Sequence, residues 1–331
     1  MFRLNCEIEI ETKTEFVYFR AVESIEISSG WEQLTQTAKI RVPDRFTRDG
    51  KKISVGSDGF FKRGDKIKIS IGYLESTPQL TTIFVGYITK ISVNSMIEIM
   101  CDDLTFELKQ KSFTKTFSNI TLENLMKQLM IESGSTMNYK VSGNATTTPF
   151  TQYQVNTATA AMAFDDLKKN GFHTFYTLNE NKLICGFPYI HDRKEHTFDF
   201  EFNVIDDDLV VYDKNEIKFR IVYRTITKTG EKLEVVLGDP DGETKVFERL
   251  NIKDQTALKA LAENKLKEYK RDGLSGSFTT FIDPIVMFGD IVNLRSKKYP
   301  EKNGSFYVKK VETTFGVNGG RQKIHLDRIA Q

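Results

Sequence analysis

The sequence predicts a mainly β protein with an α/β insertion. Apolar and polar residues alternate with a period of two through the first hundred residues and again after about residue 210, as in half-buried strands. Between these stretches, around residues 122–130 and 157–167, apolar residues recur at helical spacing. The composition agrees, because 25 Phe and 12 Tyr stand beside only 7 Pro, and aromatic side chains pack well on sheets.

Charge and cysteine usage narrow the class of protein. With 47 Lys+Arg against 45 Asp+Glu, the formal net charge of the 331 residues is +2, which argues against bulk electrostatic binding of nucleic acid or anionic membranes. Three separated cysteines predict folding in a reducing cytoplasm without disulfides. The N-terminus alternates polar and apolar residues, so we expect no signal peptide, and the lack of a long apolar run predicts no membrane insertion.

Residues 1–111 are predicted to form successive short strands. Apolar side chains of the first strand fall on one face: Phe2, Leu4, Cys6, Ile8 and Ile10. Alternating runs follow at 67–71, 83–87, 91–93 and 97–99, separated by Gly-, Asn- and Ser-containing turns. Antiparallel strands at this spacing are typical of a small barrel or sandwich.

Residues 112–205 are predicted to form a mixed α/β module. Thr121 is a suitable N-cap for a helix whose apolar stripe is Leu122, Leu125, Met126, Leu129 and Met130. A second helix is expected to begin at a Thr157 cap and to stop at Asn170-Gly171. Strand patterning returns between Phe172 and Pro188.

Residues 206–331 return to β structure with one helix. Alternation at 217–223 and 233–237 predicts two strands, and the Gly-Asp-Pro-Asp-Gly segment at 238–242 is interpreted as a hairpin turn into the next strand. The third helix is expected at about 254–271, capped by Asp254.

An internal sequence repeat links the first and last parts of the chain. A Gly-Asp turn feeding a strand occurs twice, 225 positions apart (64 to 289), and each copy precedes a strand that begins with glycine and a further strand that ends in aspartate. This order predicts two related β-barrels flanking a different module. The positions marking the repeat are Gly64, Asp65, Gly86, Gly289, Asp290 and Gly304.

This layout resembles the phage tail baseplate hub proteins, also called late control protein D, whose fold also forms the base of type VI secretion spikes. The first set of resembling residues is the strand at 86–91, the run at 96–108 and the segment 113–117 leading into the Thr121 helix. The second set is the helix at 260–266, Phe-Gly-Asp-Ile-Val at 288–292 and the strand at 304–311. The resemblance spans nearly the whole chain.

The resemblance implies a homotrimer with two tube-type barrels in each chain. Three chains would then provide six similar units and match a hexameric tail tube. Because the chain ends soon after the second barrel, the spike is expected as a separate protein. The implied partners are the tail tube protein, the spike and other baseplate proteins, with DNA only in transit through the lumen. The implied location is the virion tail or baseplate, assembled in the bacterial host cytoplasm.

The residues favour a non-enzymatic role. His191, Asp192 and His196 match no zinc spacing, and Asp239-Pro240-Asp241-Gly242 departs from a calcium loop because its glycine comes at position four. The sequence shows no Gly-x-Ser-x-Gly motif and no isolated pair of catalytic carboxylates. We therefore expect no catalytic residues, no metal and no cofactor.

Two other interpretations remain open. A β-rich carbohydrate-binding or adhesion module at a particle tip would explain exposed aromatic residues in loops, such as Phe60-Phe61. A hydrolase would require a convergent acidic or nucleophilic site. Lysine clusters at 62–68, 109–115 and 295–298 are interpreted as solvated strand edges, because no aromatic platform accompanies them.

Overall fold

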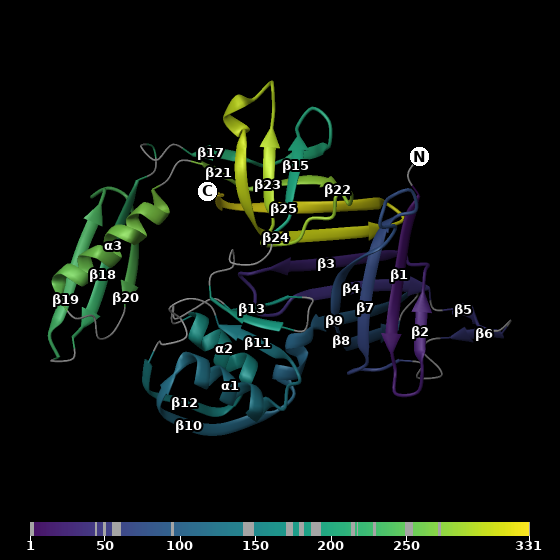
Figure 1. The fold of residues 1–331 in the computed structure, drawn as a ribbon, viewed down its shortest axis with the longest axis horizontal. Helices are drawn as coiled ribbons and strands as arrows, with labels where there is room; N and C mark the ends of the chain where they lie inside the picture. Colours follow the sequence, from purple (N-terminus) through teal and green to yellow (C-terminus); the bar gives the residue numbers. More distant parts are fainter. Residues whose placement is uncertain are drawn as a thin grey trace. The chain divides into compact units, whose positions relative to one another are not determined.

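A computed structural model defines the fold (Figure 1). The described residues are 3–43, 45–48, 51–54, 61–93, 96–141, 149–169, 175–178, 182–186, 193–212, 216, 218–227, 230–248, 254–270 and 273–330. They form a mainly β protein with an α/β insertion, as predicted. The chain divides into two compact units, one comprising Met1–Asp207 with Ser277–Gln331 and the other Asp208–Gly276.

The second unit was not anticipated from the sequence. The predicted boundaries at 111/112 and 205/206 stay a prediction, whereas residues 208–276, expected inside the second barrel, form a compact unit with its own apolar core. The physical reason is that α3 and the strands before it bury apolar residues against each other, including Ile221, Val235 and Leu258.

A thirteen-stranded sheet dominates the first unit. Its strands are β1 (Leu4–Glu11), β2 (Phe16–Phe19), β3 (Ser24–Gly30), β4 (Thr37–Pro43), β7 (Lys66–Tyr73), β8 (Thr81–Val93), β9 (Met96–Asp103), β15 (Glu195–Asp199), β16 (Val204–Asp207), β22 (Ser277–Phe281), β23 (Ile291–Arg295), β24 (Gly304–Gly316) and β25 (Gly319–Ile329). The strand order is β16-β22-β25-β24-β3-β4-β9-β8-β7-β1-β2, with β23 pairing β24 and β15 pairing β23. Strands from both ends of the chain therefore share one sheet, whose described pairing is an open path.

The strand alternation predicted for the N-terminus is confirmed. Cys6, Ile8 and Ile10 are buried, while Glu7 and Glu9 on the other face are partly exposed. These apolar residues belong to a core that also includes Ile282 and Phe315 from the last part of the chain. A separate pair, β5 (Arg45–Arg48) and β6 (Lys51–Ser54), forms a small ladder, and η3 (Pro300–Lys302) precedes β24.

The inserted module mixes helices with short sheets. Its elements are η1 (Leu104–Lys109), β10 (Ser112–Thr121), α1 (Leu122–Ser133), β11 (Asn138–Val141), β12 (Pro149–Thr159), α2 (Ala160–Lys169), β13 (Phe175–Leu178) and β14 (Lys182–Cys185). The α1 prediction is confirmed, since the Thr121 hydroxyl accepts a hydrogen bond from the amide of Asn124 at 3.4 Å. The predicted apolar stripe of α1 is buried in the module's core beside Phe164 and Leu167 of α2.

The predicted cap of the second helix is wrong by two residues. Thr157 lies in β12 with φ +46°, and its amide donates to the Thr114 hydroxyl instead of starting a helix. The first turn of α2 is closed by Thr159, whose hydroxyl accepts from the amide of Met162 at 3.3 Å. Two nearby threonines offer the same cap chemistry, and strand pairing with β10 decides between them. The expected stop at Asn170-Gly171 lies outside the described residues.

The second unit packs one helix on a three-stranded sheet. Its elements are β17 (Val210–Tyr212), β18 (Phe219–Ile226), β19 (Lys232–Gly238), β20 (Glu243–Glu248), α3 (Gln255–Tyr269) and β21 (Gly273–Ser275). The predicted cap of α3 is confirmed, because the Asp254 carboxylate accepts from the amide of Ala257 at 2.8 Å. The sheet order is β19-β18-β20, and β17 pairs with β21 (Figure 1).

The hairpin predicted at residues 238–242 is wrong. β19 runs antiparallel to β18, whereas β20 runs parallel to β18 on its other side, so this segment crosses over the start of β18. A Cβ at Gly238 would come within 2.1 Å of the Phe219 carbonyl oxygen, and one at Gly242 within 2.7 Å of the Lys218 backbone. The two glycines thus permit the close approach that the crossover needs.

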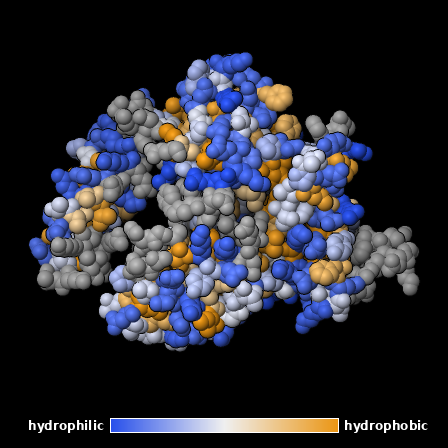
Figure 2. All heavy atoms as spheres, viewed as in Figure 1, coloured by the Kyte–Doolittle hydropathy of each residue, from blue (hydrophilic) through white to orange (hydrophobic). Residues whose placement is uncertain are grey.

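Hydrophilic side chains cover much of one face of the protein. Figure 2 shows blue hydrophilic side chains over much of the face in view, with orange hydrophobic side chains interspersed. In the described part of the chain, no helix combines the length and apolar character needed to cross a bilayer.

Candidate functional site

The first Gly-Asp turn joins the start of β7 to β8. The Gly64 amide donates to the Ile88 carbonyl at 2.8 Å, and the Ile88 amide donates back to the Asp65 carbonyl at 2.9 Å. Gly64 has φ +92°, a left-handed conformation that favours glycine. The Asp65 carboxylate closes the turn by accepting from the Lys62 amide at 2.7 Å.

The second Gly-Asp turn has the same hydrogen bonds. Gly289, with φ +90°, donates to the Val308 carbonyl at 2.8 Å, and the Val308 amide donates to the Asp290 carbonyl at 3.0 Å. The Asp290 carboxylate accepts from the Met287 amide at 3.0 Å, three residues earlier in the chain, as Asp65 does. The two turns therefore have equivalent geometry in β7–β8 and β23–β24.

Strand register extends the equivalence but corrects one pair of glycines. Gly86 lies opposite Ile67 in β7, whereas Gly304 lies opposite Leu294 in β23, two positions further along. The residue that corresponds to Gly86 is Phe306. Both glycines begin or interrupt a strand, but Gly86 lies two residues before Ile88, which bonds the first turn, whereas Gly304 lies four residues before Val308, which bonds the second.

Both long strands carry a bulge at the same place. In β8 the register shifts between Ile88 and Lys90, and in β24 it shifts between Val308 and Lys310. Each bulge begins at the residue that bonds the Gly-Asp turn. A bulge bends and twists its strand, so both strands change direction at equivalent points.

The equivalent strands are arranged in two six-strand groups, which we call repeat 1 and repeat 2. Repeat 1 has the order β3-β4-β9-β8-β7-β1, and repeat 2 has the order β16-β22-β25-β24-β23-β15. The two are joined by a ladder in which Lys310–Gly316 of β24 pairs with Ser24–Gly30 of β3. The groups differ at their last strand, because β1 is antiparallel to β7 but β15 is parallel to β23.

Asp290 has more partners than Asp65. Besides Met287, it accepts from the Lys194 amide at 3.1 Å, and its other oxygen lies 3.1 Å from His196 Nε2. His196, considered above as a metal ligand, is thus paired with a nearly buried carboxylate. Among the described residues no cluster of three or more His, Cys, Asp or Glu side chains has metal-site geometry, and His191 and Asp192 lie outside them.

The polar face of the joined sheet carries ion pairs across strands. Lys39 and Arg41 of β4 contact Glu98 of β9 at 2.8 and 3.3 Å, and Lys310 contacts Glu312 within β24 at 2.7 Å. Hydrogen bonds from the lysines hold the pKa of Glu98 and that of Glu312 below the usual range. Positive and negative charges are interleaved on this face, so it presents no single-sign field to a ligand.

A buried carboxylate at the end of β9 was missed from the sequence. Asp103 accepts hydrogen bonds from the amides of Gln36 and Thr105 at 3.1 and 3.0 Å, from the Thr105 hydroxyl at 2.6 Å and from the Thr177 hydroxyl. Burial raises its pKa above the ordinary carboxyl value. Because Thr177 lies in β13, this cluster ties the inserted module to the sheet; the Asp-Asp-Leu-Thr run was a cap signal that the sequence did offer.

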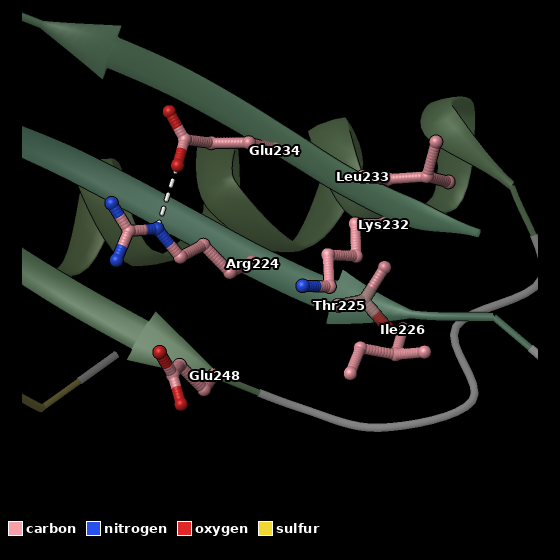
Figure 3. A pocket seen from close by; sticks show the side chains of 7 residues that line it. All are labelled: Arg224, Thr225, Ile226, Lys232, Leu233, Glu234 and Glu248. Atoms are coloured by element: carbon pink, nitrogen blue, oxygen red, sulfur yellow. Dashed lines mark hydrogen bonds and ion pairs between the residues drawn. The ribbon is translucent and has the colours of Figure 1, made fainter. Parts of the chain in front are cut away.

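A hollow of about 380 Å³ lies on the sheet of the second unit (Figure 3). Arg224 of β18 points toward Glu234 of β19, with Nε 2.6 Å from the carboxylate, and Glu248 of β20 lies opposite Arg224 in the register. These side chains are about half exposed, so the ion pair contributes at most about 1 kcal/mol. One guanidinium between two carboxylates suits a structural ion-pair role.

The three cysteines are unreactive as nucleophiles. Cys6, Cys101 and Cys185 are buried and form no disulfide, and burial raises the pKa of Cys6 to about 11 and that of Cys185 to about 12. A thiol attacks as its thiolate, which these raised values disfavour at neutral pH.

The fold is that of phage tail proteins. A tail protein from Neisseria meningitidis MC58 superposes with a TM-score of 0.70 at 12% identity, over 98% of this chain and 96% of that chain. The 43 kDa tail protein of prophage MuSo2 from Shewanella oneidensis gives 0.67 at 13% identity, over 97% and 98%. An E. coli type VI secretion component, described as structurally similar to phage T4 tail proteins, gives 0.60 at 10% identity, over 98% and 77%. The resemblance inferred from the sequence is thus confirmed at the level of fold.

Residues 4–218 match the model of the Alg8 N-terminal domain family. Because this match covers more than half of the sequence, the chain belongs to that family. No curated protein sequence matches the chain.

Proposed function

We propose that this chain is the structural hub of a phage or phage-like contractile particle, in which a homotrimeric ring adapts a hexameric tail tube to a trimeric spike. The observation that carries the proposal is the repeated register: two six-strand groups share strand order, Gly-Asp turn and bulge. Three chains with two such groups each provide six similar units, which is what a six-fold partner requires.

The fold supports this role. Chains with this fold include tail proteins and a type VI secretion component. In the proposed ring, the repeats are related by about 60° around the three-fold axis, since six equivalents complete a circle. The proposed partners are the spike, the tube protein and other baseplate proteins, and DNA passes through the lumen in transit.

The inserted module is proposed to brace the outside of the ring. It has its own core, built on the α1 stripe, Phe164 and Leu167, and it breaks the pattern of the two repeats. Replacing residues 112–185 by a short Gly/Ser linker tests this role, because β15 and β16 of repeat 2 then stay in the chain. Retained trimers with lost baseplate assembly are expected, whereas monomers would show that the module makes the trimer.

The molecular mass in solution tests the proposed ring. Light scattering of the purified chain should give three times 38.0 kDa. A stable monomer at micromolar concentration would contradict the hub and favour the carbohydrate-binding or adhesion module instead.

A further inference from the structure

Two strand segments have one edge without a strand partner in the described part of the chain: the end of β8 in repeat 1, and β17, which pairs only with β21. Within the chain, β24 of repeat 2 pairs along its edge with β3 of repeat 1. The counterpart of β24 is β8. The described part of β8 pairs with β7 only through residues 81–87, so within the described residues Lys90–Val93 pairs with β9 and with no strand on its other edge. In repeat 2 the equivalent edge of β24 is paired with β3, whereas in repeat 1 this edge of β8 has no strand partner.

The counterpart of β3 is found by carrying the register through repeat 2. Ile25 pairs with Ile40 in repeat 1, and Asp207 pairs with Phe278 in repeat 2, which relates β3 to residues 182 positions later (25 to 207). The same offset of 182 relates Ser28 of β3 to Val210 of β17. The strands that pair with them agree: Thr37 lies opposite Ser28 and Ser275 lies opposite Val210, and these two partners are 238 positions apart, as are Ile40 and Phe278. By register, β17 thus corresponds to Ser28–Gly30 of β3.

Several positions in the ladder between β24 and β3 are buried, whereas their counterparts in β8 and β17 are exposed. Ser29 and Gly30 of β3 are buried beside β24, but their counterparts Val211 and Tyr212 are 47% and 40% exposed. Thr313 of β24 is 5% exposed, whereas its counterpart in β8, Val93, is 54% exposed. The exposed positions carry larger apolar side chains than the buried ones do.

We propose that the Lys90–Val93 edge of β8 pairs antiparallel with β17 of a second copy of this chain. Transfer of the internal ladder, in which Lys310 faces Gly30 and Glu312 faces Ser28, sets Lys90 opposite Tyr212 and Ser92 opposite Val210. The proposal rests on the proposed trimer and names its subunit interface. Each copy offers one edge of each kind, so the contact is head-to-tail, the type of interface that a cyclic trimer uses.

The physical rationale is edge protection. A strand edge with unpaired backbone groups and apolar side chains is a template for association, and soluble proteins shield such edges or use them. The strand β17 contains no lysine or proline that would block pairing along its edge. Pairing with another copy buries them as β24 buries the equivalent part of β3.

Engineered cysteines test the register directly. In the full chain with Ser92→Cys and Val210→Cys, mild oxidation should produce covalent dimers and trimers on a non-reducing denaturing gel, since directly opposite residues are close enough for a disulfide. The matched control combines Ser92→Cys with Val211→Cys, whose side chain points to the other face of its strand. It should stay at the mass of one chain, and the three buried native thiols give little background.

A second variant separates this interface from the ring itself. Val211→Lys should shift the protein from trimer to monomer in light scattering, whereas Val236→Lys, an equally exposed valine on β19, should not. A trimer that survives Val211→Lys and fails to cross-link at 92–210 would overturn this interface and leave the hub standing. A wild-type monomer would overturn both.

Discussion

The two six-strand repeats agree in their inner strands and differ at their outer ones. The Gly-Asp turn, the bulge and the order of the inner strands are shared, yet β1 joins repeat 1 antiparallel and β15 joins repeat 2 parallel. A parallel neighbour requires a long connection, and the chain between β15 and β23 contains the whole second unit. The comparison shows that turn and bulge determine the register of a repeat, while the direction of its last strand depends on how the chain reaches it.

The largest effect is expected from matched truncations in the core. Ile99 of β9 and Ile324 of β25 occupy equivalent positions, each almost completely buried. Ile99→Ala and Ile324→Ala should each lower the free energy of unfolding by about 2–5 kcal/mol through lost burial and a cavity. Chemical denaturation measures both, and a loss below about 1 kcal/mol at only one site would show that the repeats do not carry equal weight in the fold.

Removing the carboxylates of the two Gly-Asp turns should lower the free energy of unfolding by different amounts. Asp65→Ala removes the acceptor of the Lys62 amide, whereas Asp290→Ala also removes the acceptor of the Lys194 amide and the partner of His196. A buried polar group left without a partner costs about 1–3 kcal/mol, so Asp290→Ala should destabilise more than Asp65→Ala. Thermal unfolding of both variants measures the difference, and equal losses would mean that the parallel strand β15 gains nothing from Asp290.

The turn glycines should respond alike. Gly64→Ala and Gly289→Ala place a Cβ at φ near +90°, and the expected loss is about 1–2 kcal/mol for each. No atom lies within 4 Å of a Cβ at Gly64, so backbone strain is the cause there. Gly64→Asn is the matched control and should cost less, because asparagine tolerates positive φ better. An Ala variant as stable as wild type would remove the conformational argument for this turn.

The smallest effect expected is the pH dependence of stability that Asp103 causes in repeat 1, where β9 leads into η1. Burial raises the pKa of Asp103 in the folded protein above the unfolded value, so the folded state binds the proton more tightly and stability falls as pH rises from about 4 to the raised pKa. Asp103→Asn does not titrate, and its penalty relative to wild type should therefore be largest near the acidic end of this range and shrink as pH rises. Denaturation at a series of pH values checks the slope, and a penalty that grows with pH would contradict the raised pKa.

Local signals in the sequence predicted the parts of the fold that depend on local chemistry. Thr121 and Asp254 cap helices where expected, because a cap needs only a side-chain oxygen and the amides that follow it. The Thr157 cap was wrong since pairing with β10 keeps that residue in a strand. The hairpin at 238–242 was wrong because turn chemistry does not reveal on which side of β18 the next strand lies.

The candidate site was predicted in part. Gly64-Asp65 and Gly289-Asp290 mark turns with the same hydrogen bonds, but Gly86 and Gly304 do not correspond because they lie two and four residues before the residue that bonds the turn. The Asp290–His196 pair could not be read from spacing, since a parallel strand 94 residues away brings the histidine there. The second unit was missed because its strands alternate like those of the large sheet, and only packing separates them.

The ladder between β24 and β3 has a consequence for how the protein unfolds. Because β24 pairs with β3 and Phe315 of β24 packs in the apolar core of repeat 1 beside Ile25, neither repeat can open without breaking contacts of the other. Amide hydrogen exchange in β9 and β25 should then occur through a single cooperative event. The unit at 208–276 has a separate core, so its amides can exchange through an opening of their own. A calorimetric scan would accordingly show two transitions, with both repeats melting together in one of them.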